Sequence, residues 1–245
     1  MIKLYSDDFG YSPKTDKSII RLIRRGKLFG VSILSTMVSA HSLRQLKRIL
    51  AQKNNLLLGV HINLIEGKPS LNHIKIKSLL NGEGEFFPLV LFILKLLFQR
   101  VDKAQIKSEI EGQLTRLKNQ GLKIKALDSH QHTHALSPIA EIVVDASHDY
   151  GIPYIRSFNS IKTYSLKAKF TYFFLKVLAF LSYFATYKKI GMPVTWRLKK
   201  KFDWTVMSWE GDSFDATSIK DNRAAFVIHP YLPYDTNRSY KNYIK

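Results

Sequence analysis

The stretch "IKLYSDDFGYSPKTDKSIIRLIRRGKLFGVSILSTMV", residues 2–38, contains the pattern that decides the fold. "IKLYS" alternates and is rich in β-forming residues, so it predicts a short strand that delivers Asp7 and Asp8 at its carboxyl end. "TDKSIIRLIRRGKL" has apolar residues at helical spacing, with Thr15 or Asp16 as the expected N-cap and Gly26 as the stop. "GVSILSTMV" predicts the next strand, so these residues form a strand–helix–strand unit.

The same alternation continues along the rest of the chain. Further helices are expected at residues 41–52, 89–100, 103–121 and 138–151. Further strands are expected at residues 55–64, at 122–134 where the strand runs into a loop, and at 152–158, 202–211 and 224–233. Strands that alternate with helices of about a dozen residues are typical of parallel βαβ units, so we predict an α/β protein. The sequence contains no internal repeat and no interdomain linker, and we expect residues 1–245 to form a single domain.

Length and composition narrow the classes of protein. The 245 residues are 45% hydrophobic and 23% charged, which is ordinary for a folded chain. The chain has no cysteine, which excludes disulfides, thiolate metal ligands and a cysteine nucleophile. Its first residues do not resemble a signal peptide, so we expect a cytoplasmic protein.

The chain is strongly basic, with 38 Lys and Arg against 19 Asp and Glu and a formal net charge of +19. This excess favours phosphate-rich partners in general. It is concentrated in residues 150–202, which contain basic side chains but no acidic one.

Several polar residues lie where predicted strands end. These residues are Asp7, Asp8, His61, His130 and His229. In parallel α/β barrels the loops that follow the strands gather at one face, where active sites lie, so these five side chains could converge.

Each of these residues also has a structural interpretation. Asp7 and Asp8 are either a carboxylate pair that shares a cation and a proton or a turn before Gly10. His61, in the apolar strand "LLLGVHINL", is either a metal ligand or a core histidine with both ring nitrogens hydrogen-bonded.

The stretch "DSHQHTH", residues 128–134, is a third candidate. In an extended segment His130, His132 and His134 would point to one face, and Asp128 would share it and could orient an imidazole. A solvated histidine-rich loop is the alternative.

Taken together, these motifs resemble the YdjC-like carbohydrate deacetylase family. The family pattern stands here as "DDFG" from Asp7, "GVHINL" from Gly59, "DSHQHTH" from Asp128 and "IHP" around His229. The resemblance implies an irregular TIM-like (β/α) barrel that hydrolyses the acetamide of an amino sugar or chito-oligosaccharide with a metal ion.

The resemblance also implies roles for single residues. Asp8, His61 and His130 become the metal ligands, Asp7 the general base, and His229 an acid or a transition-state stabiliser. Further candidates for substrate contacts or for orienting the ligands are Asp128, His132, His134 and Arg156. One divalent cation, Mg or Zn, would suit such ligands, since two histidines and one carboxylate leave positions open for water and the acyl oxygen.

An apolar segment separates this chain from a plain sugar enzyme. Residues 169–189, "KFTYFFLKVLAFLSYFATYKK", lie between lysine clusters in a basic helical insertion around 165–200. They could cross a membrane, lie on its surface, or pack on the barrel or in a homodimer. With the apolar residues 87–100, they suggest a glycolipid substrate, and some relatives of the family are associated with hopanoid lipid biosynthesis.

A non-catalytic basic module that binds an anionic membrane or nucleic acid is the rival hypothesis. The charge of +19 supports this rival. The sequence contains no recognisable nucleic-acid motif, and basic charge alone is weak evidence, so we expect no specific nucleic-acid partner.

Overall fold

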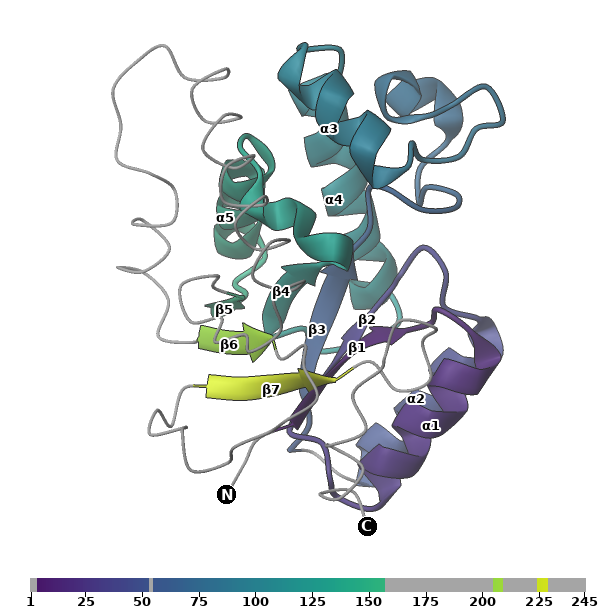
Figure 1. The fold of residues 1–245 in the computed structure, drawn as a ribbon. Helices are drawn as coiled ribbons and strands as arrows, with labels where there is room; N and C mark the ends of the chain where they lie inside the picture. The colour runs from purple at the N-terminus through teal and green to yellow at the C-terminus, as the bar shows by residue number, and fades with distance from the viewer. Residues whose placement is uncertain (1–3, 53–54, 157–204, 209–223, 229–245) are drawn as a thin grey trace, which may run out of the picture.

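The computed structural model describes residues 4–52, 55–156, 205–208 and 224–228. Their strands form one seven-stranded sheet in the order β5-β4-β3-β2-β1-β7-β6, and every neighbouring pair is parallel (Figure 1). The strands are β1 (Leu4–Phe9), β2 (Gly30–Ile33), β3 (Leu57–Ile62), β4 (Ala126–Ser129), β5 (Tyr154–Ile155), β6 (Thr205–Ser208) and β7 (Ala224–Ile228). The predicted α/β class is confirmed.

The strand order is the one met on going round a barrel, but the barrel expected from the family resemblance is not confirmed. Within the described residues no pairing joins β5 to β6, so the sheet is open between these strands. Most of the chain between them, including the apolar insertion expected around 165–200, lies outside the described residues.

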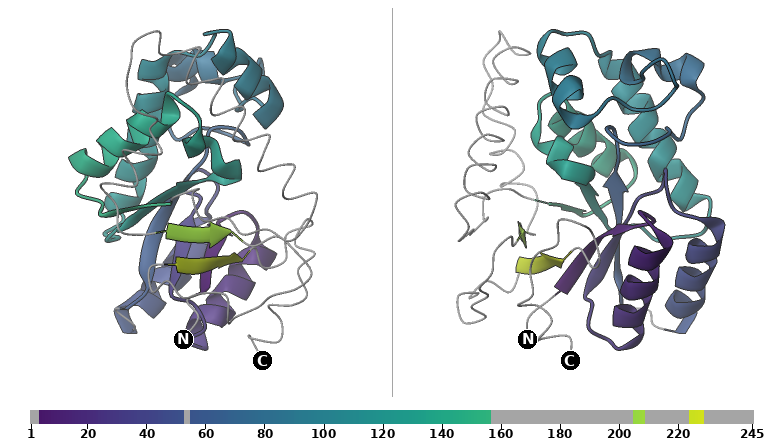
Figure 2. Two further views of the ribbon diagram at one scale, coloured as in Figure 1. Left: turned by 60° about the vertical axis from the view of Figure 1, so that its left-hand side comes forward. Right: turned by 45° about the vertical axis from the view of Figure 1, so that its right-hand side comes forward.

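Helices cover one face of the sheet. They are α1 (Pro13–Arg24), α2 (Ala40–Gln52), α3 (Leu89–Leu97), α4 (Lys103–Lys118) and α5 (Ile139–Asp149), with the 3₁₀ segments η1 (His73–Leu79) and η2 (His130–Ala135). In Figures 1 and 2, α1 packs beside α2 and β1, while α4 packs against β3 and α5. The buried core holds apolar residues of β2, β3 and β4 together with those of the helices. Among the described residues, no helix has both the length and the hydropathy needed to cross a membrane.

The start of α1 differs from the sequence prediction. The N-cap is Ser12, whose hydroxyl accepts from the backbone N–H of Thr15 at 3.2 Å, and Pro13 occupies the first turn. Asp16 instead accepts from the backbone N–H of Gly10 at 2.6 Å, which holds the turn that follows β1. The predicted stop is confirmed, because the helix ends just before Gly26, which has a φ of +67°.

The other face of the sheet changes from apolar to polar along the strands. Near the amino ends, Tyr5, Leu57 and Ala126 form a small buried cluster. Only glycine leaves room for the Tyr5 ring, because a Cβ at Gly30 would lie 2.6 Å from its ring atoms. Residues two apart on a strand share a face, so the positions that follow toward the carboxyl ends present their side chains beyond this cluster. We call this polar region the site face; its residues are Asp7, Ser32, His61, Asp128 and Arg156.

Buried polar side chains of α4 hold the long connection between β3 and α4 in place through hydrogen bonds. Gln113 of α4 donates to the carbonyl of Asn63 at 2.6 Å and accepts from its backbone N–H at 2.9 Å. Glu109, one turn earlier, accepts from the backbone N–H groups of Ser70 and Leu71. These contacts hold the connection, which includes α3, at the end of the sheet where the strands finish.

Candidate metal centre

Asp8 owes its position to an irregularity in β1. Successive side chains of a regular strand point to opposite faces, which would separate Asp7 from Asp8. Here the register with β2 shifts between Ser6 and Phe9, and Asp8 adopts a left-handed φ of +62°. A non-glycine residue in this region carries backbone strain, which clusters at functional sites. The shift allows both carboxylates to reach the site face.

Asp8 and two histidines, from three separate segments, form one group. Oδ1 of Asp8 lies 3.3 Å from Nε2 of His61 and 3.0 Å from Nδ1 of His130. All three residues are buried, with 1 to 2% of their surface exposed. Each offers a ligand atom, and these atoms lie within 4.8 Å of one another, which is close enough to hold one cation.

Asp128 orients the imidazole of His61. Its Oδ1 lies 2.7 Å from Nδ1 of His61 and also accepts a hydrogen bond from the Ser32 hydroxyl. A carboxylate at Nδ1 keeps the proton on that nitrogen and leaves Nε2 to face Asp8, the arrangement found around histidines that bind metals. A second group that could hold a cation, Asp7, His61 and Asp128, shares His61 with the group around Asp8.

Arg156 binds carboxylates within the protein. Its two terminal nitrogens donate to the two oxygens of Asp7 at 2.7 and 2.5 Å, and one also donates to Asp128 at 2.7 Å. The side chain is 2% exposed, so its position favours orienting Asp7 and Asp128 over the alternative of substrate contact. A bidentate pair of this kind fixes the orientation of the carboxylate.

The charges of the candidate metal centre fit a divalent cation. Its three buried carboxylates, Asp7, Asp8 and Asp128, and the guanidinium of Arg156 leave two negative charges, which are offset either by two protonated imidazoles or by one dication. Burial alone would lower the pKa of His61, but Asp7, Asp128 and Asp8 outweigh it and raise the pKa to about 10. For His130, contacts with Asp8 and Glu66 likewise outweigh burial and raise the pKa. Both shifts favour the protonated imidazoles in the metal-free protein, so a metal that binds here would displace protons.

The histidine-rich stretch is not extended, which corrects the expectation of one shared face. β4 ends at Ser129 and η2 begins at His130, with left-handed φ values of 48° at Gln131 and 59° at His132. The turn separates the three histidines, so that only His130 joins Asp8. His134 is buried and its Nδ1 lies 2.5 Å from the Ser129 hydroxyl, while His132 is partly exposed. Burial lowers the pKa of His134 well below its usual value, so this imidazole is neutral.

Glu66 is a site residue that sequence reasoning missed. Its Oε2 lies 2.9 Å from Nε2 of His130, and its Oε1 accepts from the Tyr11 hydroxyl at 3.1 Å. The hydrogen bond with His130 lowers the pKa of Glu66. Its position in the connection after β3 did not by itself indicate a site residue. Ser32 was also missed, although its parity on β2 places it on the site face.

His229 lies outside the described residues, so its predicted catalytic role stays a prediction. The last residue of β7, Ile228, pairs in register with Ser6, one position before Asp7.

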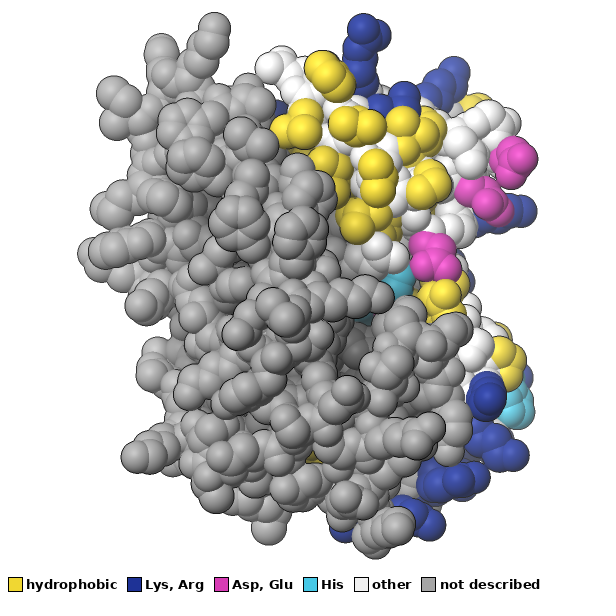
Figure 3. All heavy atoms as spheres, viewed as in Figure 1, with side chains coloured by type: hydrophobic (Ala, Val, Ile, Leu, Met, Phe, Trp, Pro, Cys, Tyr) yellow, Lys and Arg dark blue, Asp and Glu magenta, His cyan; other side chains and the backbone are white. Residues whose placement is uncertain are grey.

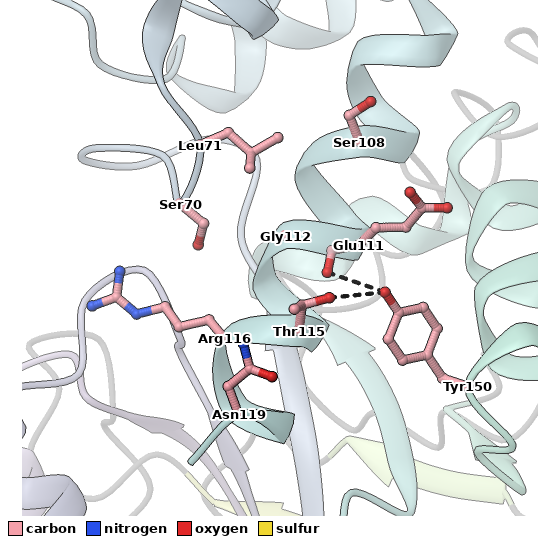
Figure 4. Close-up of a pocket in the computed structure, with 9 residues that line it drawn as sticks. All are labelled: Ser70, Leu71, Ser108, Glu111, Gly112, Thr115, Arg116, Asn119 and Tyr150. Carbon is pink, nitrogen blue, oxygen red and sulfur yellow. Dashed lines mark hydrogen bonds between the residues drawn. The ribbon is translucent and has the colours of Figure 1, made fainter.

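A groove elsewhere on the surface contains none of these residues. It lies along α4, between the connection after β3 and the end of α5 (Figure 4). Its lining includes the polar residues Ser70, Glu111, Arg116 and Tyr150, with the Tyr150 hydroxyl 2.9 Å from that of Thr115. The groove is therefore separate from the candidate metal centre.

Comparison with known proteins places these features in a family. A family model described as YdjC-like protein matches residues 1–241. A mouse protein named carbohydrate deacetylase is 32% identical over 154 residues, which are 62% of this chain and 48% of the relative. A protein of the same name from Thermoanaerobacter pseudethanolicus is 30% identical over 151 residues, which are 60% of this chain and 57% of the relative. The chain thus spans about half the length of the curated relatives it matches.

A solved structure supports the fold. It is a crystal structure of an Enterococcus faecalis protein described as a candidate cellobiose-phosphate cleavage protein. The TM-score is 0.57 at 20% sequence identity, and the match covers 88% of this chain and 82% of the other. At this identity the likeness concerns the fold alone.

Proposed function

The chain belongs to the YdjC-like protein family, and on that premise we propose that it is a metal-dependent hydrolase that removes the acetyl group of an N-acetylated sugar. One observation carries the proposal: Asp8, His61 and His130, from three separate segments, form a buried group able to hold one cation. The names of the curated relatives supply the substrate class.

The residues of the candidate metal centre suit amide hydrolysis. A divalent cation held by Asp8, His61 and His130, with Mg or Zn as the expected ions, would polarise the acyl oxygen and lower the pKa of a water molecule. Asp7 lies beside this group and would take the proton from the attacking water, since a base must stand within hydrogen-bond reach. Arg156 holds Asp7 in one orientation through two hydrogen bonds.

The departing amine needs a proton. His229 is the residue we propose as its donor, because it follows directly on Ile228, which pairs with Ser6, the residue before Asp7. The partly exposed His132 is our candidate for substrate contact, whereas buried His134 would support the turn after β4.

Several finer points belong to the same proposal. The acetylated substrate is an oligosaccharide or a lipid-linked sugar, and residues 1–245 act as one deacetylase domain in the cytoplasm, with a homodimer as a further expectation. The membrane contact expected through residues 169–189 falls outside the described residues.

The test is a screen of acetylated sugars and glycolipids for acetate release. Purified protein would be stripped of metal and reloaded with Mg, Zn, Mn or Fe, and we expect release only after reloading. Metal content would be measured in parallel. Protein that binds no metal but binds DNA or anionic vesicles in a salt-sensitive way would replace this proposal with the non-catalytic alternative.

A further inference from the structure

The helix α3 is apolar except for Lys95, although it lies at the surface. Phe92, Ile93 and Leu96 face the core and are buried. Four residues on its outer side are large, apolar and exposed: Val90 at 71%, Leu91 at 43%, Leu94 at 45% and Phe98 at 72%. A helix that is hydrophobic all round is normally covered, and exposed patches of this kind mark interaction sites. We call these four residues the α3 patch.

Cations accompany the α3 patch. Lys95 belongs to the same helix and lies over the ring of Phe87, 4.3 Å from its centroid, while Arg100 follows the helix and is exposed. Residues 87–101 contain no acidic side chain, and Glu83 and Glu85 belong to the loop before them. Figure 3 shows the hydrophobic side chains gathered together, with Lys and Arg side chains at the upper end.

We propose that the α3 patch docks on an anionic lipid surface, with its apolar side chains at the boundary of headgroups and acyl chains. An apolar face beside cations suits such an interface, because phosphate headgroups complement the cations while the acyl boundary takes the apolar side chains. A helix of nine residues is much too short to span a bilayer, which requires about 20. The contact is therefore peripheral.

Charge argues against the other occupants. A second copy of the chain also carries a net charge of +19 and would bring the same cations to the patch. Residues 169–189 contain Lys169, Lys176, Lys188 and Lys189 and no acidic residue, so this segment would also meet like charge. Anionic headgroups alone among the three carry the complementary charge.

The location of the α3 patch gives the contact a use. The connection that carries α3 leaves β3 at the end that bears His61, and Glu66 of the same connection reaches His130. The right-hand view of Figure 2 shows β3 pointing toward this connection. A docked membrane would therefore lie on the side of the molecule where the candidate metal centre is built.

Vesicle co-sedimentation tests the inference without any measurement of catalysis. The full chain would be mixed with vesicles of phosphatidylcholine alone or of phosphatidylcholine with phosphatidylglycerol, at low and at high salt. We expect binding to the anionic vesicles at low salt. For the Val90→Ser, Phe98→Ser double variant we expect binding to be weaker by about tenfold or by more, because two large apolar side chains are no longer buried in the vesicle surface. The Lys17→Gln, Arg21→Gln double variant, which removes two exposed cations from α1, should lose less.

Three results would overturn the proposal. The first is no binding of the unaltered chain to anionic vesicles, and the second is equal loss in the two double variants. The third is a Val90→Ser, Phe98→Ser double variant that binds vesicles as the unaltered chain does but differs from it in dimerisation or in melting temperature. Loss of a dimer in light scattering would then assign the patch to a second copy, and a lower melting temperature would assign it to a segment of the chain itself.

Discussion

The candidate metal centre and the α3 patch invert the usual distribution of side chains. In the first, charged groups such as Asp8 and Arg156 are almost fully buried, while in the second Val90 and Phe98 are mostly exposed. Buried charge and exposed apolar surface are the two informative departures from ordinary burial, since each costs stability. The centre offsets its cost internally through ion pairs, whereas the patch has no such partner among the described residues. The first region pairs its charged groups with one another, and the second suits an external surface.

The largest effect is expected when the two adjacent carboxylates of the centre are replaced one at a time. We expect Asp7→Asn to reduce acetate release by about a thousandfold, the size of a lost general base. Asp8→Asn should reduce it at least as much, because it removes a ligand of the cation that activates the water. Only Asp8→Asn should also lose the bound metal, because Asp7 contacts Arg156 instead. Kinetics and metal content measured on the same samples distinguish the two, and an active Asp7→Asn enzyme would contradict the role of Asp7.

Arg156→Met tests whether the centre depends on its buried cation. The change leaves Asp7 and Asp128 without their partner, so we expect the free energy of unfolding to fall by about 3–5 kcal/mol. Arg48→Met, at an exposed position of α2, is the control and should change it by less than about 0.5 kcal/mol. Urea unfolding measures both, and equal values would show that the ion pairs contribute little.

The free energy of unfolding of the metal-free protein is expected to change gradually with pH. The pKa of His61 is raised to about 10 from an ordinary value of 6.5. Protonated His61 therefore contributes stability that is fully present below pH 6.5 and is lost as the pH rises through 10. Urea unfolding with a chelator, from pH 6 to 10, should show a decline that is shallower in His61→Gln. A variant with the same slope would refute this coupling.

The smallest effect is expected at the edge of the centre. Glu66→Gln weakens the group that holds His130, and loss of such an outer contact lowers metal affinity by about 10- to 100-fold. Glu111→Gln is the matched control, since its carboxylate is partly exposed and pairs with Lys107 at 3.7 Å. Calorimetric titration of metal into both variants measures the difference, and equal affinities would limit Glu66 to a surface contact.

Much of the fold could be predicted because its signals are local. The strand β3 lies within the residues that periodicity indicated, and α2 begins one residue before the predicted start and ends where it was predicted to end. The N-cap of α1 was predicted wrongly, because Asp16 and Ser12 are both good capping residues and only the turn after β1 engages Asp16 elsewhere. The closed barrel depends on pairing between distant strands, which local periodicity does not report.

The candidate metal centre could also be predicted in part from the sequence. The rule that strands end at one edge indicated that Asp8, His61 and His130 could converge, and the structure brings them together. The alternation rule failed for the histidine-rich stretch, because left-handed residues end the strand at Ser129. Glu66 could not be found, because it belongs to the connection after β3 and not to a strand end, and only the fold of that connection brings it to His130.

The sequence by itself determined a parallel α/β protein with polar residues at its strand ends, because side-chain periodicity and turn chemistry are properties of neighbouring residues. Only the tertiary structure decided which partners those residues meet. It turned Asp7 toward Arg156 and Asp8 toward the histidines, and it left one apolar side of α3 exposed. Such choices depend on register shifts and on packing between segments far apart in the chain, where burial makes each charge require a specific partner.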